Sequence, residues 1–311
     1  MLFINDLPLC LIHSNLDIYA DDVTLSCAFK REKSDQIVTS LTNDLENIVH
    51  WSHSNKMAIN EEKTKAMLVI GKRQWKHYDI DHNLEIPLDG ISIEQVKHHK
   101  LLGVQLDENL TFEYHIEDLC KKLSKRIGLL RHISPYLKRS QREFYYNAVI
   151  KPTMLYGAPI WSYGNTELEK RVLNLQKSAA RIILGAERSS RSVTMFNSLD
   201  WLPFYIDSHI NRCALVFKRT KGLLPSYLND ILKLNSDIHS RNTRFSKLNL
   251  MCPFHKKITE GGRSFIVRSI KDWNALDKSL KQALTIKSFK SKLFNKLLNK
   301  QKSELRFLNS T

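Results

Sequence analysis

The chain has 311 residues, of which 42% are hydrophobic and 26% charged, and its net charge at pH 7 is +16. With only 10 Gly and 8 Pro it is neither collagen-like nor low-complexity, and its length favours about two folded domains. No stretch approaches the roughly 18 consecutive apolar residues of a membrane helix, and the start, which includes Asp6, is not typical of a signal peptide. We therefore expect an intracellular protein, nuclear or cytoplasmic, without a membrane partner.

The five cysteines are widely separated and never occur as C-x-x-C, which argues against a disulfide framework. Cys252 and His255 form a lone C-x-x-H pair, and two ligands do not close a tetrahedral zinc site. The sequence therefore predicts neither disulfides nor structural zinc.

Charge is unevenly distributed along the chain. Residues 1–60 contain four basic and eight acidic side chains, whereas residues 261–311 contain twelve basic and three acidic ones. Solvated helix faces would account for the basic excess, and so would a surface for a polyanion such as nucleic acid. Composition alone does not decide between the two.

In chain order, the first predicted element is a β-hairpin. Apolar residues alternate with polar ones at positions 16, 18 and 20 and again at 23, 25 and 27, on either side of Asp21-Asp22. Helical spacing then predicts an amphipathic helix from Ser34 to about Ser54, with Ser34 as N-cap and Asn55 as the stop. Strands are predicted next, punctuated by glycines, at residues 66–70, 88–96 and 101–106.

Helical patterns take over beyond about residue 110. They predict helices at residues 116–133, 141–150, 168–184, 205–218 and 288–298. The fold class is therefore α+β, with antiparallel hairpins and a helix first and a mainly helical remainder. We place one domain boundary near residue 110 and a second in the polar stretch 235–262.

Adjacent carboxylates at the turn of the first hairpin are the strongest chemical signal. Asp21 and Asp22 are close together, which is costly unless cations neutralise them, and hard oxygen ligands suit Mg²⁺. The plain alternative is an ordinary Asp-Asp turn. The segments that follow favour the metal-binding interpretation of Asp21 and Asp22.

Those segments resemble, block by block and in order, the reverse transcriptases of non-LTR (LINE-like) retrotransposons. In the first hundred residues the matching blocks are Phe3–Pro8, Tyr19–Leu25 (Tyr-Ala-Asp-Asp-Val-Thr-Leu), Trp51, Asn55–Asn60, Lys63-Thr64 and Lys100–Asp107. Further on they are Ile150–Pro152, Tyr156-Gly157, Trp161, Leu175–Lys177, Ala179–Ile182, Trp273–Leu276 and Ser288–Ser291. The resemblance runs through almost the whole chain.

The resemblance implies three regions. Residues 1–110 would be the C-terminal part of a polymerase palm with its Tyr-Ala-Asp-Asp hairpin, 111–235 a helical thumb, and 236–311 a basic C-terminal extension. The implied activity is RNA-directed DNA synthesis, a phosphoryl transfer assisted by two Mg²⁺ ions. The implied partners are an RNA template, a DNA primer and deoxynucleoside triphosphates.

Roles for individual residues follow from the resemblance. Asp21 would bind the metals with Asp22 beside it, and Tyr19 would lie near the primer end. Lys63 would approach the triphosphate as a general acid or charge stabiliser; the alternative is a solvated turn lysine. Leu102-Gly103 would form a primer-gripping hairpin; the alternative for Gly103 is a plain β-turn glycine.

A basic stripe on the first predicted thumb helix suits a duplex backbone. Helical spacing places four basic residues on one face, Lys121, Lys122, Lys125 and Arg126. Such contacts would be blind to base sequence and weakened by salt. Trp161, Trp201 and Trp273 stand among apolar neighbours, and we assign them to the core rather than to nucleic acid.

The chain departs from the family pattern in what precedes Tyr19. In the family a first metal-binding aspartate and a fingers subdomain lie well upstream of this hairpin, and residues 1–18 match neither. We therefore expect the 311 residues alone to be inactive as a polymerase. Three hypotheses stay open: a fragment of the enzyme, completed upstream or by a complementing N-terminal half; a non-catalytic nucleic-acid-binding remnant; and the product of a decayed element.

Overall fold

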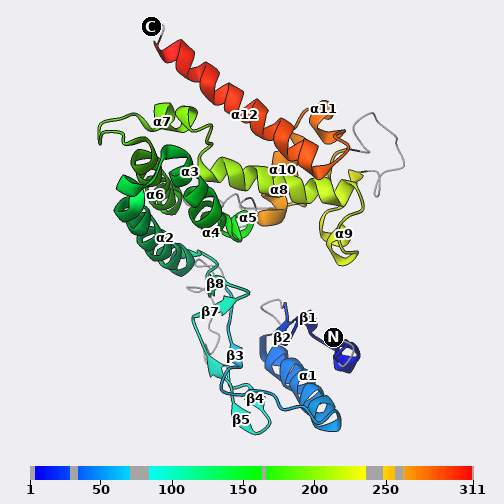
Figure 1. The fold of residues 1–311 in the computed structure, drawn as a ribbon. Coiled ribbons are helices and arrows are strands. Elements are labelled where there is room, and N and C mark those ends of the chain that lie inside the picture. The colour runs from blue at the N-terminus through cyan, green and yellow to red at the C-terminus, as the bar shows by residue number, and fades with distance from the viewer. Residues whose placement is uncertain are drawn as a thin grey trace. The chain divides into compact units, whose positions relative to one another are not determined.

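A computed structural model describes residues 4–28, 34–70, 84–162, 166–235, 248–255, 262 and 264–309. The chain forms two compact units, Met1–Tyr114 and His115–Thr311 (Figure 1). The second predicted boundary, at residue 235, adjoins residues 236–247, which lie outside the described residues. Among the described helices none is long and apolar enough to cross a membrane.

Unit 1 is built from helix α1 and short strands. Its elements are the 3-10 helix η1 (Leu7–Cys10), β1 (Asn15–Tyr19), β2 (Asp22–Ser26), α1 (Ser34–Ser54), β3 (Lys65–Ala66), β4 (Pro87–Leu88), β5 (Ile91–Ser92), β6 (Glu94–Gln95), β7 (His98–Leu101) and β8 (Val104–Asp107). β1 with β2, β4 with β5 and β7 with β8 pair in antiparallel, and β3 with β6 in parallel. The predicted helix 34–54 and the first hairpin are confirmed.

The other strand predictions were only partly right. The predicted strand 88–96 is wrong as one strand, because Asp89 (φ +49°) and Gly90 (φ +81°) turn the chain between β4 and β5. Residues 101–106 likewise do not form one strand; a turn at Leu102-Gly103 separates β7 from β8. In both places a glycine with positive φ reverses the chain instead of merely interrupting it. Of the predicted strand 66–70 only Ala66 lies in a strand, β3.

The core of unit 1 lies between α1 and the segment 84–93. Leu45 of α1 is buried together with Ile86, Leu88 and Ile93. Leu25 of β2 packs against the same cluster, so the first hairpin shares a core with α1. This places the acidic turn on a hairpin whose second strand is held by apolar contact.

Unit 2 is helical. Its elements are α2 (Glu113–Ile133, of which the first two residues belong to unit 1), η3 (Ser134–Tyr136), α3 (Arg139–Tyr145), the π-helical turn η4 (Tyr146–Ile150), α4 (Lys151–Leu155), α5 (Ala158–Trp161), α6 (Thr166–Leu184), α7 (Ser192–Ser198), α8 (Phe204–Thr220), α9 (Tyr227–Ile231), α10 (Phe265–Asn274), α11 (Lys278–Lys281) and α12 (Ile286–Asn309). The five predicted helices all occur, and α10 was missed. Helices with small, mostly antiparallel strand pairs agree with the α+β class.

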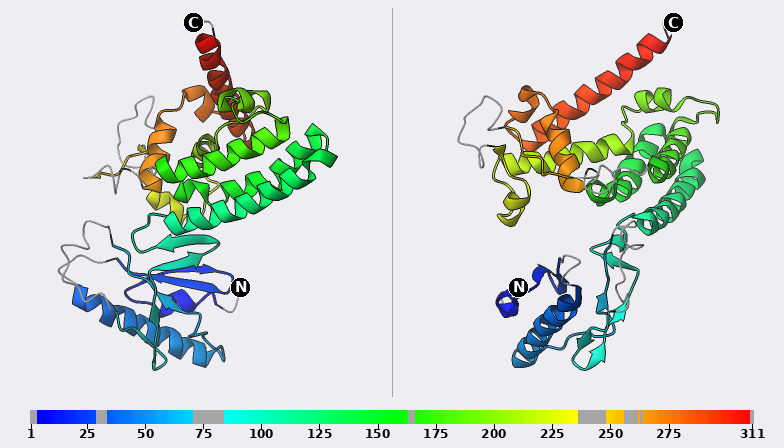
Figure 2. Two further views of the ribbon diagram at one scale, coloured as in Figure 1. Left: turned by 90° about the vertical axis from the view of Figure 1, so that its left-hand side faces the viewer. Right: turned by 180° about the vertical axis from the view of Figure 1, so that it is seen from behind.

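Helix α8 is the centre of unit 2, with α10 and α12 packed along it (Figure 2). Phe217 of α8 stacks on Phe289 of α12, their ring centroids 4.8 Å apart, and Trp273 of α10 is fully buried beside them. This core draws on residues from Leu202 to Leu298. Side chains from both sides of residue 235 therefore share one core.

Candidate functional site

The acidic turn closes the hairpin of β1 and β2 with a two-residue loop. Tyr19 pairs with Asp22, so Ala20 and Asp21 form the loop. Ala20 has φ +56°, the left-handed region that a two-residue hairpin loop requires and that glycine or asparagine fills more cheaply. A strained non-glycine residue in a tight turn is typical of functional sites.

The pairing register separates a polar face of this hairpin from an apolar one. Opposed residues share a face, so the pairs Tyr19–Asp22 and Asp17–Thr24 lie on the face opposite Leu25. Tyr19, with 66% of its surface exposed, and both turn aspartates are open to solvent. The hairpin therefore presents carboxylates and an aromatic ring outward while β2 packs inward on α1.

Two carboxylates fit a hard divalent cation, but they supply only part of its shell. Mg²⁺ takes about six oxygen ligands in near-octahedral geometry, several of them water or substrate phosphate oxygens. Among the described residues no group of three or more His, Cys, Asp or Glu side chains is placed to hold a metal. Asp21 and Asp22 thus have oxygen ligands for part of a magnesium shell, and the other ligands would be water, substrate oxygens or further side chains.

Lys63 lies in a tight turn that its neighbours build. Asn60 accepts a hydrogen bond on Oδ1 from the backbone N–H of Lys63 (3.0 Å), and its carbonyl accepts one from the Thr64 hydroxyl (2.8 Å). The Asn and Thr of this block are thereby structural, and the Lys63 side chain is exposed. The described contacts do not bring Lys63 together with Asp21 or Asp22.

The second hairpin, β7 with β8, also closes with a two-residue loop. Leu101 pairs with Val104, and the loop residues Leu102 and Gly103 have φ of +44° and +83°, as a type I′ turn requires. Leu102 is 43% exposed at the tip. A glycine is demanded here by the turn itself, whatever the tip binds.

Asp107, at the end of this hairpin, is a residue whose role sequence reasoning missed. It is buried, and its carboxylate accepts hydrogen bonds from the backbone N–H groups of Asn109 (3.1 Å), Thr111 (3.0 Å) and Phe112 (2.7 Å). The Thr111 hydroxyl donates to it as well, at 3.2 Å. The signal was visible: an aspartate followed by a polar loop and a helix is typical of a capping turn.

The basic residues of α2 do not all face solvent in the same way. Lys121, Lys122 and Lys125 are exposed, whereas Arg126 is half-buried and its guanidinium donates to the carbonyl oxygen of Val149, 2.8 Å away. Lys121 and Lys122 form ion pairs with acidic residues one turn earlier, at N···O distances of 3.0 and 2.7 Å. Of the four predicted stripe residues, the three lysines are therefore exposed, and two of them are partly neutralised.

Several residues of the C-terminal motif blocks have structural roles. Gln176 is buried and donates to the Tyr146 hydroxyl (3.2 Å) and the Leu202 carbonyl (3.0 Å), while its Oε1 accepts from the backbone N–H of Phe204 (2.9 Å). Trp161, Trp201 and Trp273 are 3%, 8% and 0% exposed, which confirms their assignment to the core. The side-chain amide of Asn274 binds the backbone of Leu250 twice: its Oδ1 accepts from the Leu250 N–H, and its Nδ2 donates to the Leu250 carbonyl oxygen.

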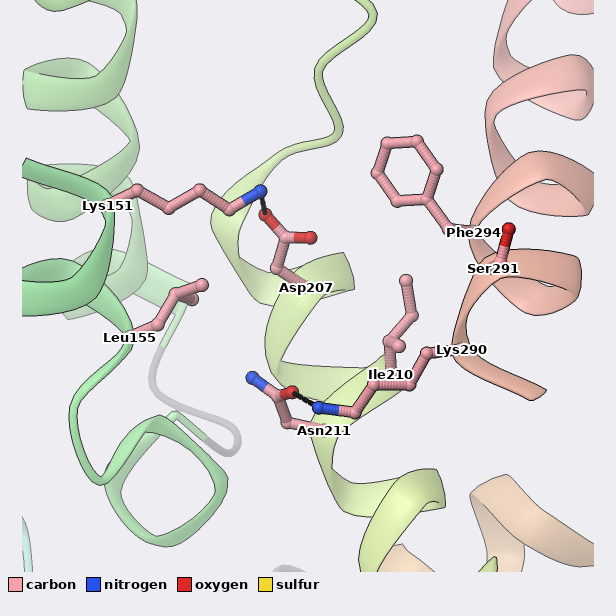
Figure 3. A pocket seen from close by; sticks show the side chains of 8 residues that line it. All are labelled: Lys151, Leu155, Asp207, Ile210, Asn211, Lys290, Ser291 and Phe294. Atoms are coloured by element: carbon pink, nitrogen blue, oxygen red, sulfur yellow. Dashed lines mark hydrogen bonds and ion pairs between the residues drawn. The ribbon is translucent and has the colours of Figure 1, made fainter. Parts of the chain in front are cut away.

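A cavity of about 320 Å³ lies between α4, α8 and α12 (Figure 3). It is lined by Lys151, Leu155, Asp207, Ile210, Asn211, Lys290, Ser291 and Phe294. Lys151 lies 3.2 Å from the Asp207 carboxylate, and Lys290 donates to Asn211 at 3.0 Å. Burial raises the pKa of Asp207 and lowers that of Lys290. These polar groups pair with one another and join the three helices.

Comparison with known proteins identifies what the chain is similar to. No family model matches it, and no solved structure does. It is 27% identical over 223 residues to a probable RNA-directed DNA polymerase from transposon X-element of Drosophila melanogaster, covering 70% of this chain and 23% of that protein. It is 26% identical over 215 residues to the probable RNA-directed DNA polymerase from transposon BS of the same species, covering 67% and 23%.

A third relative is a Pol polyprotein from type-1 retrotransposable element R1 of Nasonia vitripennis, which is 23% identical over 231 residues, covering 71% of this chain and 54% of that protein. The chain thus resembles the RNA-directed DNA polymerases of non-LTR retrotransposons, as its motifs predicted. It spans less than a quarter of the length of the two Drosophila relatives.

Proposed function

We propose that this chain is a fragment of the reverse transcriptase of a non-LTR retrotransposon and contributes two metal-binding carboxylates to its active site. The observation that carries the proposal is the hairpin of β1 and β2, which presents Asp21 and Asp22 outward from a strained two-residue turn. In this proposal residues 1–110 are part of the palm, 111–235 a thumb and 236–311 a C-terminal extension. Similarity to RNA-directed DNA polymerases supports it.

The proposed chemistry is addition of a nucleotide to a DNA primer on an RNA template. Bound Mg²⁺ would activate the primer 3′ hydroxyl and stabilise the leaving pyrophosphate. Asp21 and Asp22 would hold the metals, and the Tyr19 ring, on the same face as Asp22, would lie beside the primer end. Lys63 would stabilise charge on the triphosphate, and Leu102-Gly103 would contact the primer.

The same proposal predicts that the 311 residues do not polymerise by themselves. Two aspartates supply only part of two octahedral shells, and the family resemblance implies a further metal-binding aspartate on another strand. The active species would then be a longer polypeptide or a complex with a complementing N-terminal half.

Metal binding tests the site directly. We expect the purified chain to bind Mn²⁺, followed by the electron paramagnetic resonance signal of the free ion, and the D21N/D22N variant to bind at least about tenfold more weakly, because the charged ligands are gone. Asp89, an exposed aspartate in the β4–β5 turn, provides the matched control: D89N should bind as the wild type does. Equal affinity in D21N/D22N and wild type would refute the site.

A second candidate function, non-catalytic binding of an RNA–DNA hybrid, is favoured by the exposed lysines of α2. Charge reversal at Lys121, Lys122 and Lys125 should weaken binding. It should also reduce the magnitude of the negative slope of log K against log salt by about 2 to 3, since each phosphate contact contributes about one. Arg126 is left intact because its contact with Val149 is internal.

The control for this experiment is the same charge reversal on α12, at Lys287, Lys292 and Lys300, all exposed. It should change the slope less, while D21N should leave hybrid binding unchanged. If the α2 and α12 variants bind alike, α2 is not the interface. If D21N still binds the RNA–DNA hybrid but has lost Mn²⁺ binding, hybrid binding and metal binding are separate functions.

A further inference from the structure

Asp44 is a buried charge on the inner face of α1. Its side chain is 0% exposed, and its neighbours on that face, Leu45 and Ile48, are each 7% exposed. A carboxylate at such a position is costly unless hydrogen bonds compensate for the lost water. Asp44 therefore needs hydrogen-bond donors within the fold.

Those partners are three consecutive backbone N–H groups about thirty residues earlier. Asp44 Oδ1 accepts from Ile12 (2.9 Å), and Oδ2 accepts from His13 (3.0 Å) and Ser14 (2.7 Å). Burial by itself would raise the pKa of Asp44, but these hydrogen bonds outweigh it and hold the pKa below its ordinary value. The group stays ionised and binds the segment as an anion binds convergent donors.

The bound segment leads directly into the acidic hairpin. Ser14 precedes Asn15, the first residue of β1, and the thiol of Cys27, just beyond β2, donates to the His13 carbonyl at 3.5 Å. On the other strand, Leu25 packs against the α1 core. The base of the hairpin is thus joined to α1 by a polar anchor and an apolar one.

We propose that Asp44 is a positioning residue for the carboxylates at the hairpin tip, an inference that rests on the proposed function. β1 runs five residues from the anchor, about 16 Å at a strand's rise per residue, so a small tilt at the base becomes a larger displacement of Asp21. Metal ligands must be held to within about 0.5 Å. A buried carboxylate that fixes three amides supplies that rigidity without contacting the metal.

The sequence contained a signal for this anchor. Asp44 lies seven residues after Ile37 and four before Ile48, on the apolar stripe of the predicted helix rather than on its polar face. A charged residue within such a stripe indicates a specific buried partner. The spacing did not indicate which groups Asp44 binds.

The test replaces one atom of the anchor. In D44N the amide nitrogen is a donor and confronts backbone N–H donors, so at least one hydrogen bond is lost. We expect amide exchange of residues 15–26 to accelerate at least about tenfold, while residues 45–52 of α1 stay within about twofold of wild type. Mn²⁺ affinity should fall to a value between those of wild type and D21N/D22N. E46Q, the same charge change at an exposed position of α1, should match wild type in both measurements.

The outcomes separate the anchor from the metal site. Wild-type exchange in the D44N hairpin would overturn the inference, and so would loss of protection throughout α1, which would make Asp44 a general stabiliser. Wild-type Mn²⁺ affinity in D44N, when D21N/D22N has lost it, would also overturn it. If D21N/D22N binds Mn²⁺ normally, the proposed function fails, and the exchange data report separately on the anchor.

Discussion

Replacing Asp272 by alanine is expected to destabilise unit 2 by about 3 to 5 kcal/mol, because it leaves a buried guanidinium without its counter-ion. Arg212 is 2% exposed, and its Nε donates to Asp272 Oδ2 at 2.8 Å. The remaining partners of Arg212, the Ser162 carbonyl and the Ser208 hydroxyl, are neutral. Denaturant unfolding of unit 2, with the free energy extrapolated to water, measures the loss.

An exposed ion pair of the same unit provides the comparison. Asp277 pairs with Lys296, and both side chains are more than half exposed, so D277A should cost less than about 1 kcal/mol. If D272A and D277A lower the free energy of unfolding equally, burial does not control the strength of the Arg212 pair. That result would contradict the prediction.

The same pair predicts how stability depends on pH. Burial raises the pKa of Asp272, but hydrogen bonds and charge from His209 and Arg212 more than compensate, so its folded pKa lies below the ordinary value. A depressed carboxyl pKa stabilises the fold above the unfolded value of about 4, and this contribution is lost as pH falls through the folded pKa. The stability difference between wild type and D272A should therefore shrink below about pH 4.

Replacing Asp107 by alanine should destabilise unit 1 by about 3 kcal/mol. The substitution removes the acceptor of three backbone N–H groups and of the Thr111 hydroxyl. Of these donors, the N–H group of Phe112 makes a buried hydrogen bond. A buried donor without a partner costs about 1 to 3 kcal/mol, and the more exposed donors regain water. The free energy of unfolding of unit 1 measures the change.

Two companion variants sharpen this prediction. D107N retains one acceptor oxygen and should lose roughly half as much stability. E85Q, a neutralisation at an exposed position of the same unit, should lose almost none. A D107A chain as stable as E85Q would show that loop 108–112 holds its shape without the carboxylate.

Much of the local structure was predictable because it depends on spacing along the chain. Alternation around Asp21-Asp22 identified the first hairpin, and helical periodicity located α1 and five helices of unit 2. Strand boundaries beyond α1 were less predictable from periodicity, because the turns at Asp89-Gly90 and Leu102-Gly103 depend on a backbone dihedral angle rather than on hydrophobicity. The hairpin at Leu102-Gly103 was implied by the family resemblance alone, and the pairing of Leu101 with Val104 confirms that a hairpin forms there.

What the sequence by itself determined was therefore the first hairpin with its acidic turn, α1, five helices of unit 2 and the family resemblance, since each depends on residues close together along the chain. Only the tertiary structure decided which polar groups are used internally. Arg126 shares its spacing with three exposed lysines, yet it faces the carbonyl of Val149. Asp44 lies on the apolar stripe of α1, but the spacing does not indicate that its partners are amides about thirty residues away. A side chain's partner depends on which elements pack together, and spacing along one element carries no information about the element that faces it.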